Sequence, residues 1–349
     1  MSDKWWSLPC RISDLQFTPS EVETIGPRGV AQLLKEIGFN AQHLAFLTLG
    51  GGEATFLRGS WGVENYRVYV EEAHKAGIRV VAYLNIHWLL EEDALKHPDW
   101  TQKCEDGKPP VIHYGRGYTP CVNTPWREYS FQKARELIEG FRIDGVFLDG
   151  PSFRPHTCYC QACSEKFKRI HGSELPSWAN WKDPDWRRFI EFRFGSIEAY
   201  VKDMRKAVKE ANPEAVIYMN NRSLGSTWLG GSDTRHLAKH LDMLGNERSN
   251  IFGTSPLSCP LWMPGAAAKI LEAQADGKPY IVYICFRHLP WDYYGLTPAE
   301  LKPFIAEVVA NGAYPQIMGG IRYLDKPLSN VVKEMFDFIT SYEQYFNGT

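Results

Sequence analysis

The sequence predicts an α/β protein, a (β/α)8 TIM barrel with long loops after the third and fourth strands. Short apolar runs alternate eight times with amphipathic stretches of helical length along the chain of 349 residues. This length accommodates one barrel of about 250 residues together with insertions. The first strand-to-helix turn carries no dinucleotide or P-loop fingerprint, so we expect a closed barrel and not an open sheet.

Each expected strand is a short apolar run bounded by turn residues. The fourth is the clearest, because Val146, Phe147 and Leu148 stand between Asp144-Gly145 and Asp149-Gly150-Pro151. The expected strands cover residues 11–17, 41–48, 79–86, 143–148, 215–219, 241–244, 280–286 and 314–318.

Several expected helices carry boundary signals. Thr297, Pro298 and Glu300 form an N-cap, a first-turn proline and a capping-box partner. Glycines that we expect just past helix ends are Gly38, Gly77, Gly140 and Gly312. The expected helices cover residues 27–37, 63–76, 125–139, 196–211, 235–240, 264–275, 298–311 and 328–345. We expect one domain over residues 1–349, with insertions at about 89–124 and 150–195.

Composition narrows the classes of partner. A net charge of -2, with no basic tail, gives no electrostatic reason to expect nucleic acid or a membrane surface. No stretch approaches the roughly 20 apolar residues of a membrane span, and the N-terminal segment lacks the apolar core of a secretion signal. We therefore expect a cytoplasmic protein whose eight cysteines are reduced thiols or metal ligands. The composition suits either a monomer or a homo-oligomer.

Asp149 is the first catalytic candidate. It lies where the fourth strand gives way to its loop, and in α/β barrels catalytic groups project from that edge. The alternative is that Asp149 caps a turn or the next helix, as Asp before Gly often does.

Glu247, after the sixth strand, is our choice for a second carboxyl group that faces the same place as Asp149. Its alternative role is a rim residue paired with Arg248 or Arg222. Asp14, Glu53 and Asp292 are held in reserve. Further polar and aromatic residues at the same strand ends would bind substrate, although each alone is also consistent with a structural role. These substrate-binding candidates are Asp14, Asn85, His87, Trp88, His113, Asn220, Asn221, Arg222, Trp262, Arg287, His288 and Trp291.

Three cysteines in one tight loop, Cys158, Cys160 and Cys163, predict a metal site, because closely held thiolates repel one another unless a cation neutralises them. Zinc accepts four such ligands, and Cys121, Cys104 or His156 could supply the fourth. A site filled by cysteines would be structural and would join the loop after the third strand to that after the fourth. The alternative is a loop of unmetallated thiols. For Cys10, Cys259 and Cys285 we expect core packing.

Two segments resemble sugar-cleaving barrel enzymes. GRGYTPCVNTPWRE at residues 115–128, with CYCQAC at 158–163 and Phe167, is similar to the zinc-binding loops of glycoside hydrolase family 42 β-galactosidases. That resemblance implies Cys121 as the fourth ligand. FLDG at 147–150 is instead similar to the fourth strand of family 29 α-L-fucosidases, where the matching Asp is the nucleophile. Chains with both features are grouped as fucosidase-like glycosyl hydrolases. By the galactosidase likeness the same position would hold the proton donor.

The sequence as a whole predicts a retaining exo-glycosidase for small glycosides or oligosaccharides, α-L-fucosidase-like or β-galactosidase-like. Asp149 would be the nucleophile, or alternatively the acid/base, and Glu247 the general acid/base. A metal-dependent amidohydrolase would need His-x-His at the first strand end, where residues 12–16 read ISDLQ. A non-catalytic carbohydrate-binding barrel, which would keep the pocket and the zinc loops, is the other alternative.

Overall fold

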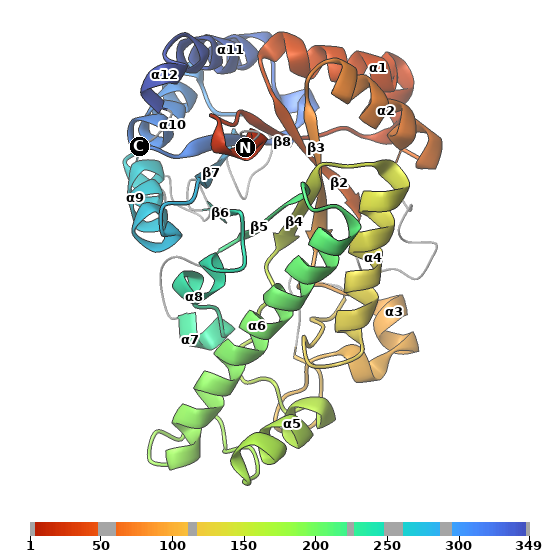
Figure 1. Ribbon diagram of the computed structural model, residues 1–349, viewed down its shortest axis with the longest axis vertical. Coiled ribbons are helices and arrows are strands. Elements are labelled where there is room, and N and C mark those ends of the chain that lie inside the picture. Colours follow the sequence, from red (N-terminus) through yellow and green to blue (C-terminus); the bar gives the residue numbers. More distant parts are fainter. Residues whose placement is uncertain are drawn as a thin grey trace.

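The structure, a computed structural model, describes residues 4–47, 61–110, 117–221, 227–247, 261–286 and 295–346. Eight parallel strands form a closed barrel in sequence order, and the last strand pairs with the first. Helices surround this barrel (Figure 1). The predicted (β/α)8 barrel is therefore confirmed.

All eight predicted strands are present, and their bounds differ from the prediction by no more than two residues. They are β1 (Ile12–Gln16), β2 (Ala41–Leu47), β3 (Arg79–Asn85), β4 (Gly145–Asp149), β5 (Val216–Asn220), β6 (Met243–Asn246), β7 (Tyr280–Cys285) and β8 (Tyr314–Gly320).

The helices follow the predicted order, and short helices are added in the loops. They are α1 (Pro19–Ile37), α2 (Val63–Lys75), α3 (Glu91–Lys96), α4 (Trp126–Phe141), α5 (Gln161–His171), α6 (Pro184–Ala211), α7 (Thr227–Gly230), α8 (Thr234–Ala238), α9 (Met263–Ala275), α10 (Pro298–Ala310), α11 (Lys326–Ser341) and α12 (Glu343–Phe346). Among these described helices, none has both the length and the hydropathy that crossing a bilayer requires.

Several predicted helix boundaries are wrong. The last expected helix, 328–345, is divided into α11, which ends at Ser341, and α12. α1 begins at Pro19 and not at residue 27, because Thr18 and Glu21 form a capping box and the chain bends at Gly26, where φ is 70°. α6 begins at Pro184 and not at residue 196, with Asp183 as its N-cap, so it crosses the expected insertion. Gly140 lies inside α4, which ends at the left-handed Arg142.

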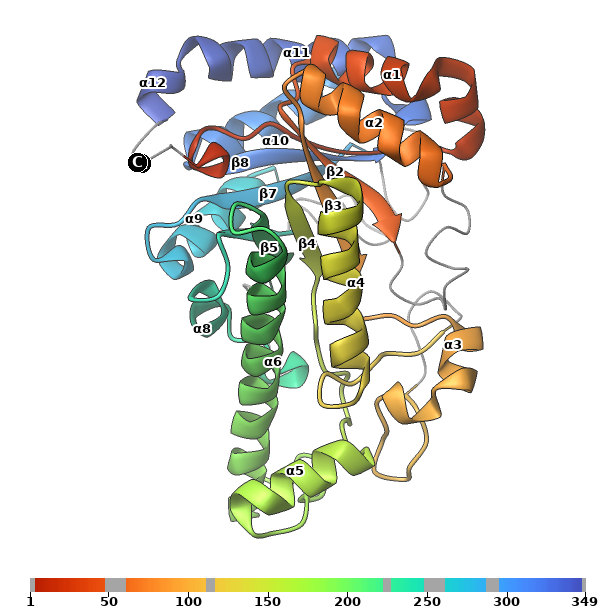
Figure 2. The same ribbon diagram turned by 45° about the vertical axis from the view of Figure 1, so that its right-hand side comes forward.

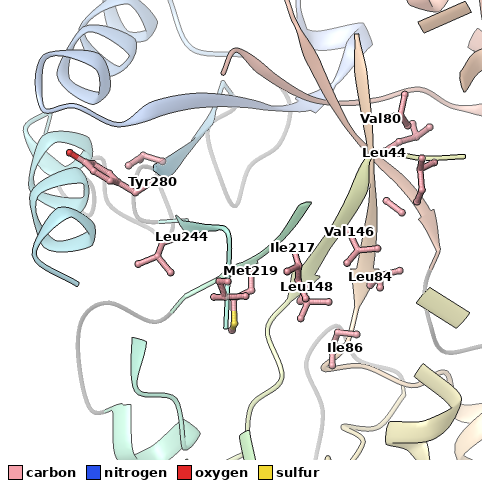
Figure 3. Packing of buried hydrophobic residues seen from close by; sticks show 14 of the residues in the cluster. Leu44, Val80, Leu84, Ile86, Val146, Leu148, Ile217, Met219, Leu244 and Tyr280 are labelled. Carbon is pink, nitrogen blue, oxygen red and sulfur yellow. The ribbon is translucent and has the colours of Figure 1, made fainter. Parts of the chain in front are cut away.

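Along each strand, side chains alternate between the barrel interior and the surrounding helices. One buried cluster fills the interior and contains Ile12, Ala41, Val81, Phe147, Val216, Tyr218, Met243, Ile281 and Tyr283. The intervening residues belong to a second cluster; Figure 3 shows Leu44, Val80, Leu84, Val146, Leu148, Ile217, Met219 and Leu244 among them. Asp149 lies two residues after Phe147 on β4, and Asn220 lies two residues after Tyr218 on β5. Both therefore end their strands with side chains that face inward.

The two long insertions pack together, as the sequence predicts. Figure 2 shows α3, α5 and the first part of α6 beyond the ends of β2 and β4. The buried Gln102 side chain joins the insertions, because its Nε2 donates to the carbonyls of Pro120 (2.9 Å) and Ser152 (2.8 Å). Its Oε1 accepts from the backbone N–H of Arg154 at 2.9 Å.

Candidate active site and metal centre

Asp149 ends β4, and hydrogen bonds hold both oxygens of its carboxyl group. The four preceding residues of the strand are buried, whereas Asp149 reaches the pocket end of the barrel. The Tyr83 hydroxyl donates to Oδ2, and the Asn220 amide donates to Oδ1 at 3.2 Å. His87 contacts the backbone oxygen of Asp149 through Nδ1 at 2.9 Å, and the same nitrogen lies 3.7 Å from Oδ2. These contacts fix the orientation of the carboxyl group.

The Asn220 side chain joins Asp149 to Glu247, which directly follows β6. Its Nδ2 lies 3.2 Å from Oδ1 of Asp149 and 2.9 Å from Oε2 of Glu247. Because one nitrogen contacts both oxygens, the oxygens cannot be farther apart than these two distances laid end to end. The structure thus brings the two predicted carboxyl groups to one place.

Asp14, in the middle of β1, is a third carboxyl group inside the barrel. Burial raises its pKa well above the ordinary value, a hydrogen bond from Gln316 opposes this, and the charges of Glu247 and Asp149 add to the rise. The neighbouring His43 has its pKa lowered to about 3 by burial. Nδ1 of His43 lies 3.6 Å from Oδ2 of Asp14, but the imidazole is neutral at neutral pH, so the two groups form no ion pair.

Gln316 completes this buried group. Its Nε2 donates to Nδ1 of His43 at 2.8 Å and lies 3.4 Å from Oδ2 of Asp14. Because the amide nitrogen of Gln316 can only donate, Nδ1 of His43 accepts this bond, and the ring proton of the neutral imidazole is on Nε2. That nitrogen is buried and has no hydrogen-bond partner among the described residues.

Other predicted substrate-binding residues take different places. Asn85 is the register partner of Asp149 and is buried, whereas Trp262 is 60% exposed at the start of α9. Asn221 points away from Asp149, because its Oδ1 accepts from the backbone N–H of Gly245 at 3.3 Å and thereby ties β5 to β6. Trp88 packs against Gly117, where an added Cβ would lie 2.4 Å from the indole nitrogen.

Several predicted residues lie outside the described part of the chain. They are the substrate-binding candidates His113, Arg222, Arg287, His288 and Trp291, the reserve carboxyls Glu53 and Asp292, and Cys259 and Arg248.

Three residues of the site were missed by sequence reasoning: Tyr83, His43 and Gln316. All three lie inside strands, where aromatic and amide side chains are easily taken for core packing. The signal that could have found them is the period of two, since Tyr83 lies two residues before Asn85 on β3 and faces the same way.

The four predicted cysteines form one buried cluster. Their sulfurs all lie within 4.8 Å of one another, and those of Cys121 and Cys163 are 3.4 Å apart. Tetrahedral zinc with bonds of about 2.3 Å to sulfur separates its ligands by about 3.8 Å, so this cluster fits zinc. Cys104 lies outside the cluster, and its backbone forms an isolated antiparallel β-bridge with Thr157. His156 packs against Trp178. All seven described cysteines are free thiols.

Comparisons with known proteins agree with the resemblance seen in the sequence. Residues 60–150 match the model of a family described as hypothetical glycosyl hydrolase 6, a segment that contains β3, Cys121 and Asp149. No curated protein matches the chain.

Solved structures share the barrel. They include α-L-fucosidase isoenzyme 2 from Paenibacillus thiaminolyticus (TM-score 0.72, 18% identity, 98% of this chain and 51% of that one). The β-galactosidase from the psychrophilic Marinomonas ef1 has a TM-score of 0.72 and 12% identity over 97% of this chain and 62% of that one. The PgaB (BpsB) glycoside hydrolase domain from Bordetella bronchiseptica has a TM-score of 0.73 and 12% identity over 94% of this chain and 99% of that one.

The predicted resemblance to fucosidases and β-galactosidases is thus confirmed, and at these identities the likeness shows the fold. The chain spans only about half of the fucosidase and about three-fifths of the galactosidase.

Replacing Asp14 tests the electrostatics of the barrel interior. A carboxyl group with a raised pKa in the folded protein stabilises it fully only below the unfolded pKa of about 3.9, and this contribution is lost as the pH rises. Asp14→Asn removes that loss, so the stability of the variant relative to wild type should be greater at pH 7 than at pH 4. Urea unfolding at both pH values measures the difference. The exposed Asp99→Asn is the control, and an equal Asp14→Asn effect at both pH values would contradict the prediction.

Proposed function

We propose that the protein is a glycoside hydrolase, a retaining exo-glycosidase acting on small glycosides or oligosaccharides of the α-L-fucosidase or β-galactosidase kind. The observation that carries the proposal is the Asn220 amide, which contacts the carboxyl groups of both Asp149 and Glu247. Two carboxyl groups that flank one small space are what glycosidic bond cleavage requires. The family match over residues 60–150 and the glycosidase folds support the same reaction class.

The short separation favours retention of configuration. Contacts of 3.2 and 2.9 Å to one nitrogen limit the distance between the contacting oxygens of Asp149 and Glu247. The sum of these two contact distances is smaller than the roughly 6.5 Å that is the shortest separation of the carboxyl groups in inverting enzymes. Inverting enzymes need the larger separation because a water molecule must fit between the acids. Retaining enzymes separate the two groups by about 5 to 5.5 Å.

In the proposed reaction Asp149 attacks the anomeric carbon while Glu247 gives a proton to the leaving oxygen. The bond from the anomeric carbon to that oxygen breaks, and a covalent glycosyl–enzyme ester forms. Glu247 then takes a proton from water, whose oxygen displaces Asp149 and releases the sugar. Tyr83 and Asn220 hold the Asp149 carboxyl group in place through both steps.

We also propose that Cys121, Cys158, Cys160 and Cys163 hold one structural zinc ion. All four thiols are buried, and no position is left for water at a tetrahedral ion with four sulfur ligands. When bound, the ion supplies charge and geometry to the loops and takes no part in the chemistry at Asp149. Free thiols of this kind suit a reducing compartment, which agrees with the cytoplasmic address expected from the sequence.

Chemical rescue separates the roles of the two carboxyl groups. On a panel of aryl glycosides, beginning with α-L-fucoside and β-D-galactoside, Asp149→Gly should lower kcat by at least about 10³-fold and Glu247→Gly by about 10² to 10⁴-fold. Azide should rescue Asp149→Gly with inversion at the anomeric carbon, and Glu247→Gly with retention. NMR of the glycosyl azides identifies the products.

Variants without azide and wild type with azide are the controls. If azide instead gave retention with Asp149→Gly and inversion with Glu247→Gly, Asp149 would be the acid/base. Absence of wild-type turnover across a broad panel, with retained sugar binding, would favour the non-catalytic barrel instead.

Tyr83→Phe tests the orientation of Asp149. The ring stays between His43 and Phe147 while the hydrogen bond to Oδ2 is lost. Because a hydrogen bond to a charged group contributes about 1.5 to 3 kcal/mol, kcat should fall by about ten- to a hundredfold with a smaller change in KM. Tyr218→Phe is the matched control, since the buried Tyr218 hydroxyl has no hydrogen-bond partner among the described residues. Equal kinetics for the two variants would refute the orienting role.

Metal analysis tests the cysteine site. Purified protein should contain one zinc per chain, and Cys158→Ser should lose it together with thermal stability, because metal binding contributes folding free energy. Cys104→Ser, in the insertion after β3 but outside the cluster, should keep its zinc. Zinc-free wild-type protein that is as stable as zinc-loaded protein would contradict a structural role.

A further inference from the structure

The Arg193 side chain is a buried positive charge without a carboxylate partner. Arg193 lies on α6, is 0% exposed and forms no ion pair with any described residue. Its guanidinium donates only to backbone carbonyls, those of Trp228 (3.0 Å), Arg154 (3.1 Å) and Leu229 (2.8 Å). These carbonyls accept from the two terminal nitrogens, while the buried Nε has no partner among the described residues. Carbonyl dipoles do not neutralise the charge, so a buried cation of this kind needs an anion nearby.

Aromatic rings supply part of the required negative potential. The guanidinium carbon lies 5.0 Å from the ring centre of Phe153, 4.9 Å from that of Trp178 and 5.8 Å from that of Phe189. Such contacts contribute about 0.5 to 2 kcal/mol each, so the three rings together offset part of the several kcal/mol that burying an ion costs.

Short chains of hydrogen bonds connect the neighbourhood of Arg193 to the cysteine cluster. The carbonyl of Arg154 accepts both from Arg193 and from the hydroxyl of Thr157, the residue before Cys158. Three residues along α6 from Arg193, Ser196 accepts from the Asn123 amide at 3.0 Å, and the same amide contacts the sulfur of Cys163 at 3.2 Å. Arg193 and Ser196, on one face of α6, are therefore connected to both of the loops that carry the cysteines.

The charges agree with this arrangement. Zinc held by four thiolates carries a net charge of about -2. Burial lowers the pKa of Arg193 to about 10, while the negative charges of Cys158 and Cys163 oppose the decrease, so the guanidinium is cationic at neutral pH. A second cation, Lys166, reaches the cluster through Asn123, whose Oδ1 lies 2.7 Å from the Lys166 ammonium. Two cations thus face a dianionic centre.

We propose that Arg193 is the charge partner of a metal–tetrathiolate centre and that it positions α7 against that centre. This inference rests on the zinc site proposed above. Through the carbonyls of Trp228 and Leu229 the guanidinium links the metal loops to α7, which follows β5 in the chain. β5 ends at Asn220, the residue that contacts both candidate catalytic carboxyl groups. Arg193 is therefore a positioning residue between the metal loops and one wall of the pocket.

The test measures how fast zinc leaves the whole protein in an excess of a chromophoric chelator. Arg193→Met and Arg193→Gln remove the charge, and Gln still donates to a carbonyl; both should release zinc at least tenfold faster than wild type. Arg193→Lys keeps the charge and should release it within about threefold of the wild-type rate. Arg205→Met is the matched control, because Arg205 lies on the same helix but pairs with Asp242 at 2.9 Å, and it should release zinc at the wild-type rate.

The outcomes separate this inference from the proposal on which it rests. Wild-type protein without zinc would refute the metal site itself. Zinc-loaded Arg193→Gln with the wild-type release rate would overturn the role of Arg193, and so would an Arg193→Lys protein that loses zinc as fast as Arg193→Met. If Arg193→Met does not fold, the comparison of Gln with Lys decides, since those two variants differ in charge while both can donate hydrogen bonds.

Discussion

The closed barrel fixes which side chains can meet, and the candidate site depends on this constraint. In a closed sheet every second residue faces inward, and parallel strands deliver their last inward residues to the same end. β4 and β5 therefore end with Asp149 and Asn220 side by side, and Glu247 enters from β6. A shift of one residue in any of these strands would turn the side chain outward and remove the amide contact that joins the two carboxyl groups.

The interior below this end is more polar than a barrel that served only stability would require. Asp14, His43 and Gln316 are buried together, and burial raises the pKa of Asp14 and lowers that of His43, so both shifts favour the neutral form. Buried polar atoms without partners destabilise the folded state, and the Nε2 of His43 is such an atom among the described residues. A polar floor under a carboxyl pair is readily explained by a ligand that brings hydroxyl groups into the pocket.

The sequence predicted the barrel, its strands and three of the four cysteines, because apolar periodicity and ligand spacing are local signals. The fourth, Cys121, was implied by the resemblance to the family 42 β-galactosidases. Individual side-chain directions were not accessible in the same way. Asn220 and Asn221 are adjacent asparagines, and only the phase of β5 reveals that the first faces the carboxyl groups while the second ties β5 to β6. Tyr83 was missed for a related reason, since an aromatic residue in a strand is usually core. α6 was predicted too short because its first turns lie within an insertion that looked like loop.

The insertions explain why a metal would be useful beside such a barrel. The segments between β3 and α4 and between β4 and α6 contain little regular structure. Few backbone hydrogen bonds therefore offset the conformational entropy that these segments lose on folding. One ion bound by Cys121 and by Cys158, Cys160 and Cys163 would close both loops at once, and the buried Gln102 already links them through the carbonyls of Pro120 and Ser152. The first loop begins beside His87 and the second directly after Asp149. An ion at the cysteine cluster would therefore also restrain the residues that surround the candidate nucleophile.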